Sequence, residues 1–201
     1  MLASAGDIEV RARFHRLVYQ FTSYNATILD FGAGTGIDAK AYAEKGHRVL
    51  VYEPCKENLS NLAENCRDEL EAGTVAITDL AMNEPADVVA ADFAVLNLIA
   101  DHRSLFTTFD HLLAPNGYVV VNMLNPFFGG DARYRWWWMN IGALMQRGDY
   151  AVQGDDGPVY RFTPAAVARA ASPLFHLIAL LPGRLGLPFA QYMFLVFRKI
   201  T

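Results

Sequence analysis

The feature that most constrains the fold is a glycine-rich turn that directly follows a short apolar segment. Residues 26–31 read ATILDF, and the chain continues GAGTG over residues 32–36 before a helix-like pattern begins. Short apolar runs of this kind are typical of buried parallel strands, and ligands of open α/β sheets bind beyond the carboxyl ends of such strands. Glycines at that point let a ligand approach the backbone and the first N–H groups of the next helix. The segment therefore predicts an α/β fold with a ligand site at this turn.

Strand-like and helix-like segments alternate along the first 125 residues. Gly46 and Gly73 end two of the helical segments, and a Pro-Asn-Gly turn at 115–117 precedes the fifth strand. Such alternation predicts a parallel sheet with right-handed crossovers and helices on both faces. The predicted strands are 26–31, 48–53, 74–78, 86–93 and 117–124, and the predicted helices are 8–24, 36–45, 55–71 and 101–113.

The end of the chain adds two more strands. Thr163 and Pro164 suit the start of a helix that runs to about Ala171, and strand-like segments follow at 175–181 and 191–199. Two strands joined as a hairpin at the end of a parallel sheet imply that one strand is antiparallel. We therefore expect a seven-stranded, mostly parallel sheet with one antiparallel strand.

Residues 126–162 depart from this rhythm and read as an insertion over the edge of the sheet. The insertion begins with an aromatic, glycine-rich stretch that contains Trp136 to Trp138, and it ends in a hairpin that turns at Gly154–Gly157. We interpret the chain as one domain over 1–201, with residues 1–25 as an N-terminal helix or cap. The insertion is a candidate lid over a substrate.

Composition narrows the class of protein. The chain has 201 residues, 53% of them hydrophobic, with 17 basic and 21 acidic residues and a net charge of −4. Proteins that hold nucleic acids by their phosphates normally carry a basic excess, so nucleic acid is not expected as the main partner. Prolines and charges break the most apolar stretch into strand-length pieces, so no membrane span is expected. Cys55 and Cys66 form no metal-binding motif, and two free thiols and the absence of a signal peptide predict a cytoplasmic protein without a metal.

Acidic residues stand at the ends of three successive predicted strands: Asp30 just before the glycine turn, Glu53 at the end of the second strand and Asp79 after the third. With the glycine turn, they predict a nucleotide-type site. Asp30 could bind a cationic end of a ligand, Glu53 could accept both hydroxyls of a ribose, and Asp79 could contact the exocyclic amine of adenine beside Leu80. Each has a simpler interpretation, because a strand-ending Glu is often only solvated and an Asp after a strand is often a helix cap. The glycine spacing is GxGxG, and Ile37 stands where a dinucleotide fingerprint has its last glycine, which disfavours NAD.

These motifs resemble those of the class I S-adenosylmethionine-dependent methyltransferases. LDFGAGTG is similar to the family's glycine-loop motif, VLVYEP to its acidic second-strand motif, TDL to its third-strand motif and PNGYVVVNML to its fifth-strand segment. The resemblance covers about residues 26–125. The stretch DFAVLNLIADHRSLFTTFDHLLAPNG is further similar to a bacterial small-molecule branch of the methyltransferase type 11/12 kind, and the segment from Trp136 through VYRFTPAAVARA resembles that branch too.

The resemblance implies a Rossmann-like sheet, S-adenosylmethionine as cofactor and methyl transfer to a small molecule. It places Asp30 near the methionine ammonium, Glu53 on the ribose, and Asn97 and Leu98 along the methionine side. The cofactor-binding residues implied in this way are Asp30, Gly32, Gly34, Gly36, Asp38, Glu53, Pro54, Asp79, Leu80, Asn97 and Leu98.

The acceptor side is less constrained by the sequence. A hydroxyl acceptor would usually need a general base, and His102 is the best-placed histidine, although it also reads as a surface residue at a helix start. Aromatic and basic residues of the insertion could wall an acceptor pocket. The candidates are Tyr134, Trp137, Tyr160 and Arg161.

Two other functions remain open from the sequence. One is a nucleotide-dependent oxidoreductase on a similar sheet, which Ile37 disfavours. The other is a methyltransferase-like binding module without catalysis, whose expected signs, a damaged loop or missing acids, are not seen. Exposed aromatic residues of the insertion could alternatively form a homodimer contact.

Overall fold

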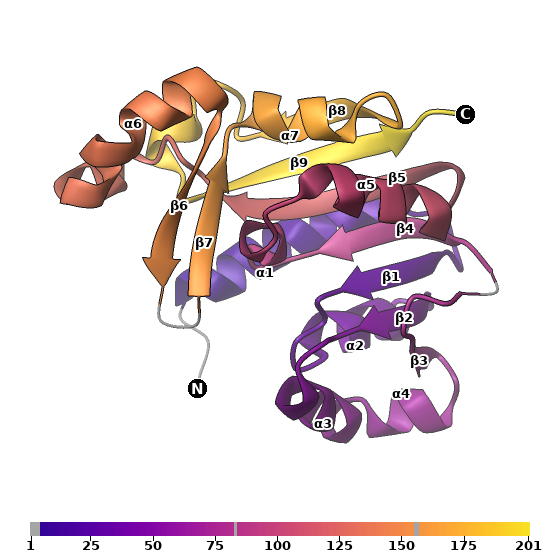
Figure 1. Cartoon of the computed structure of the whole chain (residues 1–201). Coiled ribbons are helices and arrows are strands. Elements are labelled where there is room, and N and C mark those ends of the chain that lie inside the picture. Colours follow the sequence, from indigo (N-terminus) through magenta and orange to yellow (C-terminus); the bar gives the residue numbers. More distant parts are fainter. Residues whose placement is uncertain (1–4, 83, 155–156) are drawn as a thin grey trace.

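A computed structural model describes residues 5–82, 84–154 and 157–201, and a seven-stranded sheet forms its centre (Figure 1). The strand order is β3-β2-β1-β4-β5-β9-β8, and a separate two-stranded sheet pairs β6 with β7. The central strands are β1 (Thr27–Phe31), β2 (Arg48–Tyr52), β3 (Val75–Ile77), β4 (Ala86–Ala91), β5 (Leu113–Leu124), β8 (Phe175–Leu181) and β9 (Tyr192–Lys199).

The strand directions confirm the predicted sheet. β1 pairs in parallel with β2 on one side and with β4 on the other, so that Leu29 lies opposite both Leu50 and Val89. β9 is antiparallel to both of its neighbours, β5 and β8. The chain turns from β1 to β2 on one side and later returns to β4 on the other, which creates a switch point beyond the carboxyl end of β1.

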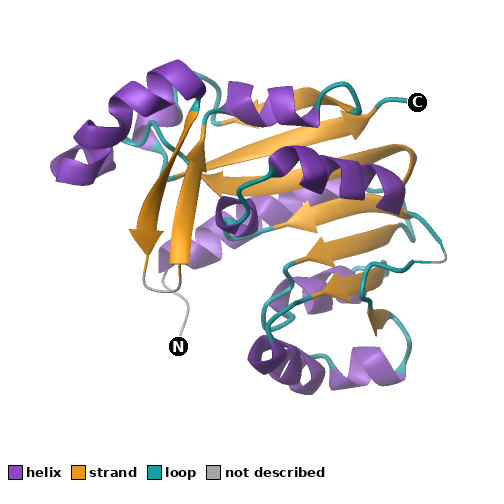
Figure 2. Cartoon of the chain, in the orientation of Figure 1, coloured by secondary structure: helices purple, strands orange, loops and turns teal. Residues whose placement is uncertain are grey.

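Helices cover both faces of the sheet, with α1 (Ala5–Gln20) and α2 (Ile37–Glu44) behind it and α5 (His102–Leu112) and α7 (Pro164–Ala171) in front (Figures 1 and 2). Each face has its own core, because the central strands are apolar on both sides. Phe14 of α1 and Tyr42 of α2 belong to one core, whereas Phe106 of α5 and Val167 of α7 belong to the other. None of the described helices is long and apolar enough to cross a membrane.

The helix predicted over 55–71 is interrupted. It forms α3 (Lys56–Asn65) and α4 (Arg67–Glu71), which are separated by Cys66. Cys66 is buried, and its thiol donates to the Gly36 carbonyl at 3.3 Å. This contact fixes α3 beneath the glycine turn, so the break between the two helices has a packing cause.

Residues 115–117, predicted as a turn, lie within β5, at a point where its pairing with β4 is irregular. β5 starts at Leu113, which is opposite Ala86, but the register then jumps so that Tyr118 is opposite Val88. Asn116 takes a positive φ of 63° there. The predicted turn before the fifth strand is therefore wrong: residues 115–117 belong to β5 and form an irregularity within it.

The insertion contains η2 (Gly129–Arg133), α6 (Arg135–Arg147), β6 (Asp149–Gly154) and β7 (Gly157–Phe162). β6 and β7 form the predicted antiparallel hairpin, and two of its turn residues, 155–156, lie outside the described residues. The hairpin stands at the side of the sheet toward which β1 and β4 point (Figure 1). Helix α6 leaves Trp138, Met139 and Met145 exposed, so the homodimer contact stays a prediction.

Candidate functional site

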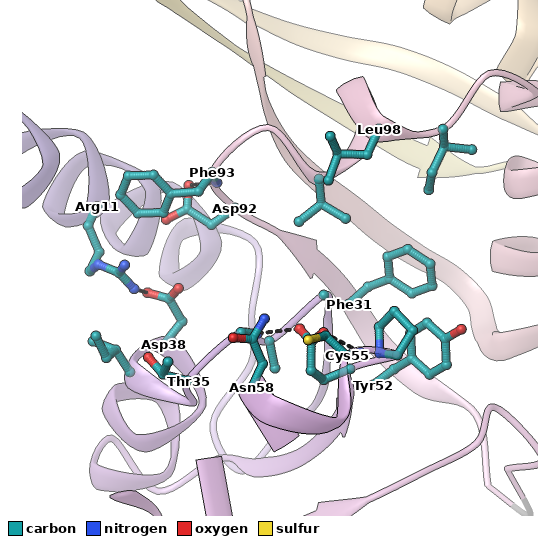
Figure 3. A pocket seen from close by; sticks show the side chains of 18 residues that line it. Arg11, Phe31, Thr35, Asp38, Tyr52, Cys55, Asn58, Asp92, Phe93 and Leu98 are labelled. Carbon is teal, nitrogen blue, oxygen red and sulfur yellow. Dashed lines mark hydrogen bonds and ion pairs between the residues drawn. The ribbon is translucent and has the colours of Figure 1, made fainter. Parts of the chain in front are cut away.

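A cavity of about 780 Å³ lies at the carboxyl ends of β1, β2 and β4, at the switch point of the sheet (Figure 3). Its volume falls in the range of small-molecule and cofactor sites. The lining residues come from α1, the loop after β1, the end of β2 and the segment after β4. They are Arg11, Phe31, Gly32, Ala33, Gly34, Thr35, Ile37, Asp38, Tyr52, Glu53, Pro54, Cys55, Asn58, Asp92, Phe93, Val95, Leu98 and Ile99.

The three glycines of the loop have different surroundings, although all three have positive φ. A Cβ on Gly32 would come within 2.7 Å of Val95, and one on Gly36 within 2.8 Å of the Cys66 thiol. A Cβ on Gly34, by contrast, would meet no atom within 4 Å. Gly32 and Gly34 line the cavity, whereas Gly36 packs against α3 and is absent from the lining. Gly34 is thus the position at which a ligand can approach the bare backbone.

Glu53 directly follows β2 and is tied to the glycine loop. Its Oε2 accepts a hydrogen bond from the Gly34 backbone N–H at 2.7 Å, and its Oε1 accepts one from Cys55 N–H at 2.8 Å. A carboxylate has about four lone-pair positions, so each oxygen can accept one more donor. The Glu53 side chain is therefore held in place beside the cavity and still has capacity to accept ligand hydroxyls.

Asp30 lies beneath the loop and does not line the cavity. It is 2% exposed, and its Oδ2 has no hydrogen-bond partner among the described residues. Burial, followed by the nearby charges of Asp38 and Asp92, raises the pKa of Asp30 well above its ordinary value. The structure therefore places a buried, incompletely paired carboxyl group directly under the glycine turn.

Asp38, at the start of α2, connects the site to the N-terminal helix. Its Oδ1 lies 2.5 Å from Arg11 Nη1 and accepts a hydrogen bond from His15 Nε2 at 2.6 Å. The Arg11 guanidinium also lies over the Phe93 ring, 4.5 Å from its centroid. Arg11 and Asp38 face each other at one end of the cavity in Figure 3. The predicted N-terminal cap thus contributes a charged side chain to the site, which the sequence did not indicate.

Asp92 also lines the cavity, and the sequence interpretation missed it. The predicted fourth strand ran to residue 93, but β4 ends at Ala91, so Asp92 follows the strand as Glu53 follows β2. Asp92 is 6% exposed and accepts a hydrogen bond from Phe93 N–H at 2.8 Å. Burial, and next the charge of Asp38, raise the pKa of Asp92 from 3.8 to about 7. The rule that singled out the other strand-ending acids would have found it.

The remaining predicted cofactor residues are divided between three places. Pro54 and Leu98 line the cavity. Asp79 lines a neighbouring hollow of about 520 Å³ that shares Tyr52 and Glu53 with the cavity. Leu80 lines neither hollow and packs instead against the core.

Asn97 is buried in the short helix η1 (Val95–Leu98), where both ends of its amide are occupied. Its Nδ2 donates to the Tyr160 carbonyl at 2.5 Å, and its Oδ1 accepts from Leu124 N–H at 2.9 Å. Asn97 does not line the cavity. Its amide joins η1 to the hairpin and to β5, so it is placed to hold the insertion against the cavity wall.

His102 lies neither in the cavity nor on the surface. It is 3% exposed, its Nε2 donates to the Leu96 carbonyl at 2.9 Å, and its ring lies 3.9 Å from that of Phe162. Burial lowers its pKa, which favours a neutral imidazole. The interpretation as a surface residue is wrong, because η1 and the hairpin cover the start of α5. The described lining residues do not include His102, so the structure does not place it where a general base would act.

The four predicted residues of the acceptor pocket also lie outside the lining. Trp137 Nε1 donates to the Pro126 carbonyl at 3.1 Å, and Tyr134 is exposed. Arg161 Nη1 lies 3.7 Å from Asp131 Oδ2, and Tyr160 packs against the core. Trp137 and Arg161 therefore make contacts within the insertion in this structure. Among the described residues there is also no group of three or more His, Cys, Asp or Glu side chains that could hold a metal.

Comparison with known proteins assigns the family. The methyltransferase domain family matches residues 7–150, which is more than half of the chain and includes every residue that lines the cavity. The chain belongs to this family. This is a family of class I S-adenosylmethionine-dependent methyltransferases, so S-adenosylmethionine is the cofactor. The predicted family and cofactor are confirmed.

Individual relatives agree with this assignment. The chain is 30% identical over 115 residues to a cypemycin N-terminal methyltransferase from a Streptomyces species, an alignment that covers 53% of this chain and 47% of that protein. The chain therefore matches about half the length of this curated relative.

Two solved structures share the fold over almost the whole chain. An S-adenosylmethionine-dependent methyltransferase from Clostridium acetobutylicum superposes with a TM-score of 0.70 at 11% identity, covering 96% of this chain and 92% of that one. A glycopeptide N-methyltransferase in complex with S-adenosylmethionine gives a TM-score of 0.69 at 13% identity, with 96% and 94% covered. At these identities the likeness concerns the fold.

Proposed function

We propose that the chain transfers the methyl group of S-adenosylmethionine to a small-molecule acceptor, with the cofactor bound in the cavity at the switch point. The observation that carries this proposal is the pair formed by Gly34 and Glu53. The first offers bare backbone that faces open space, and the second offers a fixed carboxylate that can still accept hydroxyl groups. The two groups fit the two halves of an adenosyl ligand, its methionine side and its ribose.

The other lining residues fit the rest of the ligand. Arg11 is the basic side chain of the described lining and suits the methionine carboxylate, and the buried carboxyl of Asp30 lies below the turn where the methionine ammonium would bind. The neighbouring hollow with Asp79, which shares Tyr52 and Glu53 with the cavity, suits the adenine. We therefore retain Asp30, Asp38, Glu53, Asp79 and the two cavity glycines as cofactor residues, and leave out Gly36, Leu80 and Asn97.

When bound, S-adenosylmethionine supplies an electrophilic methyl group on a sulfonium. The task of the protein is then to orient the acceptor in line with that methyl and to exclude water. The insertion is positioned for this task, because Asn97 ties its strand β7 to η1, and Leu98 of η1 lines the cavity. We propose that residues 126–162 act as the lid on the acceptor side.

A small molecule is favoured as the acceptor over a nucleic acid. The net charge is −4, and three of the side chains that line the cavity are the carboxylates Asp38, Glu53 and Asp92. Phosphate backbones would be repelled by such a surface. The cavity volume of about 780 Å³ suits a cofactor with part of an acceptor beside it.

Calorimetric titration with S-adenosylmethionine, S-adenosylhomocysteine and NAD tests the proposal. We expect micromolar binding of the two adenosyl ligands and none of NAD. Glu53→Ala should abolish the binding, and the control Glu57→Ala, an exposed carboxylate on α3 outside the lining, should leave it unchanged. A preference for NAD would support an oxidoreductase. Tight adenosyl binding without methyl transfer to any compound of a broad acceptor library would support a binding module.

A further inference from the structure

The charged groups that line the cavity are unevenly paired. Of the three lining carboxylates, Asp38 is neutralised by Arg11 at 2.5 Å, and Glu53 accepts two backbone N–H groups. Asp92 accepts one backbone hydrogen bond and forms no ion pair within the ranges that the structure describes. Arg11 is the basic residue of the described lining, and Asp38 already engages it. The cavity therefore carries an excess of negative charge beside Asp92.

Asp92 combines burial with an open hydrogen-bonding position. It is 6% exposed, and its Oδ2 has no hydrogen-bond partner in the part of the chain that the structure describes. Burial of an unpaired carboxylate is unfavourable, and here it raises the pKa of Asp92 to about 7. The Asn122 side chain, by hydrogen bonding, and the charge of Arg11 lower this pKa only in part, and no described cation forms an ion pair with Asp92, so a cationic group of the acceptor beside it would supply the missing charge.

The backbone after Asp92 is held in an unusual conformation that keeps this carboxyl at the cavity. Phe93 and Ala94 have φ values of 47° and 63°, which non-glycine residues adopt rarely. Ala94 N–H donates to Asn122 Oδ1 at 3.0 Å, which fixes the turn. The Phe93 ring lies edge-to-face with the ring of Tyr192 at 6.4 Å and forms an apolar wall next to the carboxyl (Figure 3).

The charge that develops on the acceptor distinguishes amines from hydroxyls at such a site. An amine enters as an ammonium ion or a neutral amine and leaves as a methylated ammonium ion. A hydroxyl must lose its proton as it reacts, so that negative charge develops on its oxygen. Neighbouring carboxylates stabilise the first kind of charge and repel the second. The excess negative charge of the lining carboxylates therefore favours an amine as the methyl acceptor.

We propose that the methyl acceptor is an amine and that Asp92 binds its ammonium form and takes one of its protons. This inference rests on the proposed function. The freed lone pair of the nitrogen forms a bond to the methyl carbon, and the carbon–sulfur bond breaks with its electron pair on sulfur. The products are a methylated ammonium ion, neutral S-adenosylhomocysteine and protonated Asp92, which returns its proton to water.

A matched panel of acceptors tests the class of substrate. The panel pairs primary amines with the alcohols in which a hydroxyl replaces the amino group, for example phenethylamine with 2-phenylethanol and tryptamine with tryptophol. Transfer of a labelled methyl group is measured with the full chain and S-adenosylmethionine. We expect methylated products from amine members only. Methylation of the alcohols, or of no member of the panel, overturns the proposal.

Two variants test the role of Asp92. Asp92→Asn should lower kcat/KM for an accepted amine by about 100-fold or more, whereas Asp68→Asn, an exposed control on α4, should leave it unchanged. Asp92→Glu should restore part of the loss. S-adenosylhomocysteine retains the amino group of the cofactor, so its Kd should change less than threefold in Asp92→Asn. A large loss of this affinity would assign Asp92 to the cofactor and overturn the proposal.

The dependence of kcat/KM on pH separates a role of Asp92 in the reaction from a role in stability alone. Wild-type kcat/KM should rise with pH through about 7 as Asp92 ionises, and Asp92→Asn should lose this limb. The charged groups that act on Asp92 are Asp38 of α2 and Arg11 of α1, and the Asn122 side chain of β5 also lowers its pKa. Asp92 itself acts on Asp30 of β1, Tyr42 of α2 and Tyr192 of β9. An unchanged limb in the variant contradicts the proposal. If wild-type protein fails to bind S-adenosylhomocysteine, the proposed function itself is wrong, which is a different outcome.

Discussion

The backbone N–H of Gly34 donates to Glu53 Oε2 over 2.7 Å, so the glycine turn after β1 and the acidic residue after β2 form one hydrogen-bonded unit. The Gly32 and Ala33 N–H groups strengthen this unit by donating to the Tyr52 carbonyl at 2.8 and 3.1 Å. The side chain proposed to bind the ribose therefore also shapes the turn proposed to bind the methionine side. A change at one end of the ligand site should be felt at the other.

Glu53→Gln is expected to weaken binding of S-adenosylhomocysteine by roughly 10- to 100-fold, the equivalent of about 1.5–3 kcal/mol for hydrogen bonds to a charged group. The amide has nearly the shape of the carboxylate but lacks its charge, and one of its two ends cannot accept the Gly34 or Cys55 N–H. Titration calorimetry measures the change. An affinity equal to that of the wild type would show that this carboxylate does not contact the ligand.

Two variants should have different effects: Gly34→Ala should mainly weaken ligand binding, and Gly36→Ala should mainly lower the stability of the fold. Both positions have positive φ, 55° and 83°, which costs an alanine about 1–2 kcal/mol. The new methyl at Gly34 points into open space, so we expect weakened binding of S-adenosylhomocysteine with a small loss of stability. At Gly36 the methyl would overlap the Cys66 thiol and the Leu62 side chain, which adds about 1–3 kcal/mol of destabilisation.

Thermal unfolding and calorimetry on both glycine variants provide the check. If Gly34→Ala lowers Tm more than Gly36→Ala does while binding the ligand normally, the assignment of the two glycines is wrong.

Asp92→Asn should stabilise the fold above pH 7 and have little effect on stability below pH 4. The pKa of Asp92 is raised on folding, so the folded state holds its proton more tightly, and its contribution to stability is lost as pH rises from about 4 to about 7. The raised pKa, from 3.8 to about 7, corresponds to a penalty of up to about 4 kcal/mol at high pH, which the neutral amide avoids. The difference in Tm between variant and wild type, measured at pH 4 and pH 8, tests this. A difference in Tm that does not grow with pH would mean that folding does not raise the pKa of Asp92.

His102→Leu is expected to lower the free energy of unfolding without changing the chemistry. The leucine fills the buried space but removes the hydrogen bond from His102 to the Leu96 carbonyl, which keeps only the Ile99 N–H at 3.2 Å, at a cost of about 0.5–1.5 kcal/mol. Denaturant unfolding measures the loss, and His111→Leu, an exposed position at the end of α5, serves as the control. Unchanged stability together with abolished methyl transfer would restore His102 as the general base.

Most of the sheet could be predicted because its signals are local. Apolar runs alternate with helical periodicity, and glycine or proline marks the boundaries, so the seven strands and the glycine turn after the first of them were evident. The positions of Glu53 and Gly34 followed from the rule that ligands bind at the carboxyl ends of parallel strands. Their hydrogen bond was not predicted, because it depends on the pairing of β1 with β2.

The sequence did not reveal those features whose position depends on tertiary packing or on the exact residue at which an element ends. Asp92 was hidden because ADVVAADF reads as one strand, although β4 stops at Ala91. Arg11 reaches the cavity only because α1 packs beside α2, a contact between segments far apart in sequence. Helix α6 escaped prediction because its three tryptophans are consecutive and show no periodicity. His102 was placed on the surface because the hairpin that covers it lies about 60 residues later in the chain.

A crystal structure of the chain with S-adenosylhomocysteine would show where the cofactor binds. We expect the ribose hydroxyls within hydrogen-bonding distance of Glu53, the homocysteine portion over Gly34, and Asp92 on the sulfur side with room for an acceptor. Ligand bound elsewhere on the sheet, or bound in the cavity without contact to Glu53 and Gly34, would contradict this placement of the cofactor.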